Sequence, residues 1–97
     1  MPALVALPPE ILQSICEKGE GAAREYVYSR VERKLVRSLD IRITTGERGG
    51  LQFSVDVFLE IDEALGEDVE EIAEMASEAA LEAIDREMRS INIGKAD

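Results

Sequence analysis

The sequence has 97 residues, 33% charged and 45% apolar, with a formal net charge of −10 at pH 7. A chain of this length forms one domain with a modest core. Its acidic balance is the opposite of the basic footprint of nucleic-acid-binding proteins, and an anionic membrane surface would repel it. Residues 1–7 lack a signal peptide's basic start, and no apolar run approaches the roughly 20 residues that span a bilayer. The sequence therefore predicts a cytoplasmic protein.

The first predicted element is a helix over residues 10–38. Pro8 and Pro9 stand where a helix begins, because proline at the first helical position gives up a donor that has no partner there. Apolar residues then recur at three- and four-residue spacing, which indicates one buried helix face. Gly19 and Gly21 interrupt this pattern and predict a kink or a break.

Two strands are predicted next, because the apolar period changes from about 3.6 to 2. Residues 39–44 alternate apolar with polar, as a half-buried strand does. The glycine-rich segment 46–50 is typical of a hairpin loop. Residues 51–62 alternate again, except that Phe58 falls on the polar face.

A second helix is predicted over residues 69–91. Asp68 is its expected N-cap, with Glu71 completing a capping box. The apolar stripe is rich in alanine, which allows close packing on a support. Its members are Val69, Ile72, Ala73, Ala76, Ala80, Ala83, Ile84, Met88 and Ile91.

The predicted architecture is α+β in the order helix–strand–strand–helix, with both helices on one face of an antiparallel hairpin. Residues 1–8 and 94–97 are predicted tails, and residues 9–93 form the domain. A lone hairpin is marginal and leaves two open strand edges. We therefore expect a homodimer, or a heterodimer with a similar small α/β subunit, through a strand edge or the polar sheet face around Phe58. Pairing at an edge would make a larger sheet.

Catalytic or metal-dependent activity has little support in the sequence. There is no His, so nothing activates a nucleophile, and the single Cys16 is interpreted as a small buried hydrophobe. Between Gly49 and Asp85 there are twelve acidic and no basic residues. This stretch is either a metal or acid–base site or, as we favour, a solvated surface. We predict a non-enzymatic protein with no cofactor and no bound metal.

A candidate interaction site is a basic stripe with one aromatic residue on the first predicted helix. Its members, at helical spacing, are Tyr26, Arg30, Arg33, Lys34 and Arg37. Such a stripe suits phosphates or an acidic partner surface. The simpler interpretation, which we favour, is that these cations complement the helix dipole and pair with the protein's own acids.

Four segments carry a resemblance to a known family. They are YVYSRV at 26–31, LDI at 39–41, FSVDVFLEI at 53–61 and VEEI at 69–72. In this order, and over residues 9–91, the chain resembles an archaeal family of small uncharacterised proteins. That family is similar in architecture to the Pcc-type dimerisation subunits of KEOPS, the complex that adds threonylcarbamoyl to adenosine 37 of certain tRNAs.

The resemblance implies an interaction subunit, as a paralogue of the main KEOPS dimerisation subunit, and brings no site residues with it. The alternative is a free-standing homodimer with a structural or chaperone-associated role. The negative charge argues against direct tRNA binding by this chain.

Overall fold

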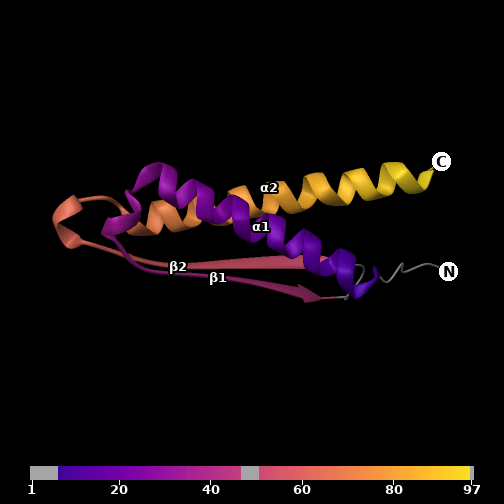
Figure 1. Cartoon of the computed structure of the whole chain (residues 1–97), viewed down its shortest axis with the longest axis horizontal. Coiled ribbons are helices and arrows are strands. Elements are labelled where there is room, and N and C mark those ends of the chain that lie inside the picture. The colour runs from indigo at the N-terminus through magenta and orange to yellow at the C-terminus, as the bar shows by residue number, and fades with distance from the viewer. Residues whose placement is uncertain (1–6, 47–50, 97) are drawn as a thin grey trace.

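The computed structural model describes residues 7–46 and 51–96, with residues 92–96 as backbone alone, and has the predicted order of elements (Figure 1). Residues 1–6 of the predicted N-terminal tail and 47–50 of the predicted hairpin loop lie outside the described residues. The elements are helix α1 (Pro9–Arg30), strand β1 (Val36–Gly46), strand β2 (Gln52–Ile61) and helix α2 (Val69–Ala96).

Helix α1 begins where the two prolines predict it and ends earlier than expected. The carbonyl of Pro8 accepts hydrogen bonds from the amides of Ile11 and Leu12, both at 3.0 Å. The helix ends at Arg30 because Val31 takes up an extended conformation, with φ −135° and ψ 133°. The prediction of a helix as far as residue 38 is therefore wrong.

The two glycines of α1 do not break it, since the helix is continuous from Pro9 to Arg30. Gly19 is buried, and a Cβ atom there would lie 2.9 Å from Cγ1 and Cδ1 of Ile84 and 3.1 Å from Cδ1 of Ile43. Gly19 thus lets α1 approach both α2 and β1. At Gly21, by contrast, a Cβ atom would meet no neighbouring atom within 4 Å.

The strands form an antiparallel hairpin in which Ile41 lies opposite Val57. Strand β1 begins at Val36, three positions before the predicted start, after a single 3₁₀ turn at Arg33–Leu35. Side chains alternate along both strands, and the apolar side faces the helices, as predicted. Its partly or fully buried members are Leu39, Ile41, Ile43, Phe53, Val55, Val57, Leu59 and Ile61.

Helix α2 has the predicted N-cap, because Oδ1 of Asp68 accepts a hydrogen bond from the amide of Glu71 at 3.2 Å. A 3₁₀ turn and Gly66, at φ 66°, reverse the chain just before it. Positive φ at Gly66 is a conformation that glycine adopts without steric cost. The helix continues to Ala96, beyond the predicted end at residue 91.

Both helices cover the same face of the hairpin, α1 over β1 and α2 over β2, and they pack on each other (Figure 1). This confirms the α+β fold class. The fully enclosed positions line the seam between the layers: Ile15, Ala23, Val27, Ile72, Ala76 and Ala80. The opposite face of the sheet carries no helix of the described chain and is exposed.

Ala80→Leu is expected to destabilise the protein by about 1–3 kcal/mol, because Ala80 has no exposed surface and extra methyl groups would overpack the seam. Urea denaturation measures the change. Glu82→Leu, at an exposed position of the same helix, is the matched control and should shift the free energy of unfolding by no more than about 0.5 kcal/mol. Equal midpoints for the two variants would contradict the packing.

Candidate functional site

The predicted basic stripe does not lie on one helix. Tyr26 and Arg30 lie in the last turns of α1, whereas Arg33 and Lys34 belong to the 3₁₀ turn and Arg37 lies in β1. The stripe depended on a helix reaching residue 38, so the early end of α1 at Arg30 separates its members. The prediction of a single helical stripe is therefore wrong.

Tyr26 and Arg30 connect the end of α1 to the segment that precedes α2. Arg30 donates a hydrogen bond to the Tyr26 hydroxyl at 2.7 Å and lies 3.7 Å from a carboxylate oxygen of Glu67. The hydrogen bond to Tyr26 and the nearby carboxylate of Glu67 raise the pKa of Arg30, which is cationic in any case. These contacts satisfy Arg30 within the chain.

The remaining cations of the predicted stripe also have neighbours in the chain. The guanidinium of Arg33 lies 4.5 Å from the centre of the Tyr28 ring. Lys34 pairs with Glu32 at 3.7 Å, and Arg37 lies 4.0 Å from Asp62. Exposed pairs of this kind contribute little stability. The geometry of Lys34 and Arg37 favours the interpretation that they balance the protein's own acids, whereas Arg33 contacts an aromatic ring.

Phe58 lies on the open face of the sheet and is 52% exposed, as its position in the alternation predicts. Arg42 lies across the ring, with its guanidinium carbon 5.4 Å from the ring centre. The Nε atom of Arg42 also donates a hydrogen bond to Asp40 at 3.2 Å, and Asp56 faces Arg42 across the hairpin. One aromatic ring and three charges thus form the centre of this face.

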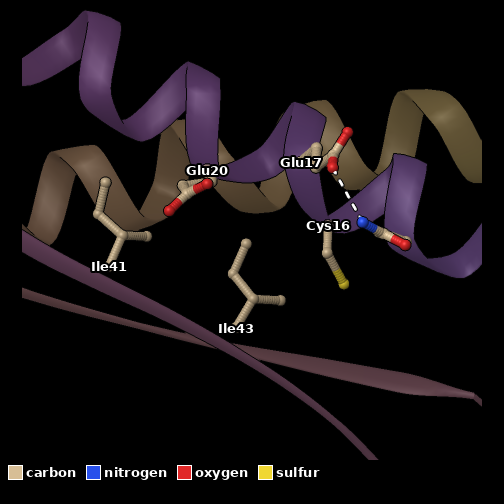
Figure 2. A pocket seen from close by; sticks show the side chains of 6 residues that line it. Cys16, Glu17, Glu20, Ile41 and Ile43 are labelled. Atoms are coloured by element: carbon tan, nitrogen blue, oxygen red, sulfur yellow. Dashed lines mark hydrogen bonds between the residues drawn. The ribbon is translucent and has the colours of Figure 1, made fainter.

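A hollow of about 230 Å³ lies between α1 and β1 (Figure 2). Ile41 and Ile43 of the strand and Cys16 of the helix line its apolar part, and Gln13, Glu17 and Glu20 line its polar part. Burial raises the pKa of the Cys16 thiol, which lowers its thiolate fraction at neutral pH. Cys16 is half-buried rather than fully buried, so the predicted buried hydrophobe is only partly enclosed.

Helix α1 has one flank that faces α2 and another that lies beside this hollow. Ala22 and Tyr26 line the groove toward Ala79 of α2, whereas Cys16 and Glu20 lie on another flank of the helix. Since α1 lies over β1, the Cys16 flank faces away from α2, above the outer edge of the sheet. Strand β1 therefore has an incompletely covered apolar side where its edge is also open.

A second hollow, of about 350 Å³, lies between α2 and β2. The described residues that line it are apolar apart from one carboxylate: Leu51, Phe53, Leu81, Ile84, Asp85 and Met88. Leu81 is 40% exposed. Both strands of the hairpin thus have a hollow beside them, of mixed lining at β1 and mainly apolar lining at β2.

Sequence reasoning did not single out Asp40 and Arg42, although a signal was present. Both fall on the polar side of the first predicted strand, two positions apart, which places them on one face. What the sequence did not show was their contact with each other and with Phe58. That cluster depends on the hairpin register.

Neither a metal cluster nor a membrane-spanning helix occurs in the part of the chain that the structure describes. In residues 7–46 and 51–91, no three His, Cys, Asp or Glu side chains come together in a way that could hold a metal ion. Within the same described part of the chain, no helix combines the length and apolar character needed to cross a membrane.

Comparison with known proteins gives a family and two related structures. A family model described as a protein of unknown function (DUF3194) matches residues 4–87. The solution structure of the hypothetical protein mth677 from Methanothermobacter thermautotrophicus is similar, with a TM-score of 0.74 and 20% identity over 92% of this chain and 97% of that chain. A crystal structure from Thermococcus onnurineus NA1 has a TM-score of 0.78 and 25% identity over 96% and 90% of the two chains. No curated protein matches significantly.

Proposed function

We propose that this chain, which belongs to the DUF3194 family of proteins of unknown function, is a cytoplasmic, non-enzymatic interaction protein that pairs through an edge of its sheet. The partner is a second copy or a similar small α/β subunit. Both archaeal neighbours share the fold, and the family is one of unknown function.

The observation that carries the proposal is the hairpin itself. Strands of 11 and 10 residues pair only with each other in the described chain, so each has an outer edge without a strand neighbour. A two-stranded sheet is marginal in water, and long open edges are ready to pair with another strand. Strand addition would give main-chain hydrogen bonds, while flanking side chains would set the choice of partner.

The chemistry of the side chains supports a non-enzymatic role. The sequence has no His. Burial raises the pKa of its single thiol, Cys16, and so lowers the fraction that is present as the nucleophilic thiolate. The cations that sequence analysis singled out contact the protein's own tyrosines and acids.

The finer form of the proposal assigns the chain to KEOPS as a paralogue of its Pcc-type dimerisation subunit, so that it acts in tRNA threonylcarbamoyl-adenosine modification. Its support is the resemblance in sequence pattern and architecture. The alternative is a free-standing homodimer with a structural or chaperone-associated role. Co-purification separates the two.

The test uses the tagged full-length chain expressed in an archaeal host and recovered under native conditions. Mass spectrometry should identify KEOPS subunits at comparable molar amounts, and an equally acidic, unrelated tagged protein serves as the control. Recovery of the chain as a homodimer without these subunits would favour the alternative. A monomer in sedimentation at micromolar concentration, with no partner recovered, would contradict the interaction role altogether.

Reversing Arg33 and Arg37 together to Glu is expected to leave partner binding intact and to change the tRNA affinity of the assembly less than about threefold. These side chains contact Tyr28 and Asp62, and a chain of net charge −10 does not attract phosphates over distance. Filter binding with labelled tRNA measures the affinity. The double variant Arg86→Glu with Arg89→Glu is the matched control. If tRNA binding were lost only in the Arg33 and Arg37 double variant, the proposal that this chain does not itself bind tRNA would be contradicted.

A further inference from the structure

Two opposite charges flank the centre of strand β1. It runs from Val36 to Gly46, so its middle residue is Ile41, and the only charged pair near the centre, Asp40 and Arg42, flanks that residue. Both charged side chains are exposed on the open face of the sheet and lie 3.2 Å apart. An antiparallel strand related by a two-fold axis would meet this pattern in reverse order.

Centring the axis on Ile41 places the two opposite charges of one strand against those of the other. Residues i and 82 − i then face each other, so Asp40 faces the partner's Arg42 and Arg42 faces the partner's Asp40. Together with the pair within each chain, these four charges alternate in sign. Ser38 and Thr44 face each other's hydroxyls at the next positions outward. Opposite charges across an antiparallel pair are stabilising, and like charges are destabilising.

The helix-facing side of β1 agrees with the same register. Ile41 would lie against the partner's Ile41, and Leu39 against the partner's Ile43. Ile41 and Ile43 border the hollow of about 230 Å³ beside Cys16 (Figure 2). A second copy in this register would bring its own apolar side chains to the open flank of that hollow. The contact therefore covers apolar surface and pairs main-chain groups at once.

Strand β2 does not offer a comparable contact with itself. Its outward-facing side chains include no cation, the members being Gln52, Ser54, Asp56, Phe58 and Glu60. A two-fold axis at Phe58 would place Asp56 against the partner's Glu60, and an axis at Asp56 would place it against its own copy. Among the described residues, the only charged one that lines the neighbouring hollow is Asp85. Self-pairing through β2 therefore offers no pair of opposite charges in any register.

From these observations we infer that the β1 edge binds the β1 edge of a second copy of this chain, antiparallel and in register about Ile41. The resulting four-stranded sheet has the order β2–β1–β1–β2 and carries four helices on one face. The inference rests on the proposed edge-pairing function and specifies which edge, which register and which partner.

A charge exchange tests the register. Asp40→Arg alone sets Arg against Arg, and Arg42→Asp alone sets Asp against Asp, so each single variant should dimerise more weakly than wild type, on the order of tenfold. Mixing the two variants restores unlike pairs, and a heterodimer of near wild-type affinity is expected. Sedimentation measures the affinities. Glu60→Arg on β2, which lies opposite Ser38 in the hairpin, is the matched control that should leave dimerisation unchanged. Weakening without rescue in the mixture would overturn the register.

A cross-link tests the same contact without altering these charges. This test can be carried out even if the Arg42→Asp variant fails to fold. In a Cys16→Ser background, chains with Ser38→Cys and chains with Thr44→Cys are mixed and oxidised. In the mixed dimer the two cysteines face each other with Cβ atoms about 5 Å apart, close to disulfide geometry. In a dimer of either variant with itself, the two cysteines lie about 20 Å apart along the strands. A disulfide-linked dimer confined to the mixture is expected, and its absence would overturn the inference.

The outcomes separate this inference from the proposed function. A wild-type dimer that is indifferent to the charge exchange and forms no cross-link overturns pairing through β1 and leaves edge pairing in place. If the wild-type chain is a monomer by itself but co-purifies with a different α/β subunit, self-pairing is overturned and the proposed edge pairing is kept. A monomer that recovers no partner overturns both.

Discussion

Gly19→Leu is expected to destabilise the protein by about 3 kcal/mol, the upper part of the range for overpacking a well-filled core. A Cβ atom at this position would already lie 2.9 Å from two atoms of Ile84 and 3.1 Å from Ile43. The remaining atoms of a leucine would have to separate α1 from both α2 and β1. Because Ile43 also lines the hollow beside β1, the same change should loosen the edge inferred to pair.

Gly21→Leu is the matched control for this effect. It lies in the same helix, and no atom is within 4 Å of the position its Cβ would take. Leucine is a better helix former than glycine, so this variant should be more stable than wild type by up to about 1 kcal/mol. Urea denaturation at pH 7 gives both values. Effects of the same sign and size would show that Gly19 is not needed for the close approach of the helices.

Ile72→Ala is expected to destabilise the protein by about 3 kcal/mol, within the range measured for truncating buried aliphatic side chains. Ile72 has no exposed surface and is one of the largest fully buried side chains. It lies in the first turn of α2, where the helix covers the sheet, and its loss leaves a cavity that rigid neighbouring elements do not fill.

Leu81→Ala is the control, because it makes a comparable truncation in the same helix where the side chain is 40% exposed. Less apolar surface is lost there, and a loss of only about 1 kcal/mol is expected. Chemical denaturation again gives the free energies of unfolding. A larger loss at Leu81 than at Ile72 would mean that the outer flank of α2, not the seam with the sheet, stabilises the helix.

Several features of the fold are determined by local sequence. Alternation of apolar and polar residues identifies both strands and places Phe58 on the open face, because successive side chains of a strand point to opposite sides. Asp68 caps α2 through a bond that spans three residues, and Pro9 starts α1. Each of these outcomes depends on neighbours along the chain, so the sequence contains the information needed to predict them.

The end of α1 was decided by tertiary packing. Val31 and Leu35 continue the helical spacing of Val27, which is why the sequence predicts a helix there. In the structure Val31 is extended and buried, and the chain turns so that β1 can pair with β2 from Val36 onward. Burial of Val31 in the shared core and a longer hairpin outweigh a few more helical hydrogen bonds.

The same reason explains which site residues the sequence did and did not predict. Phe58 and the polar face around it follow from alternation alone, whereas the stripe ending at Arg37 was lost when the helix ended at Arg30. Gly19, which the sequence presents as a helix breaker, is a contact point because Ile84, far away in the chain, lies against it. The opposite charges at Asp40 and Arg42 are present in the sequence, but only the tertiary structure shows that this strand has an open edge beside a partly apolar hollow. Burial and contact between distant segments depend on how the layers pack, and local spacing does not specify that.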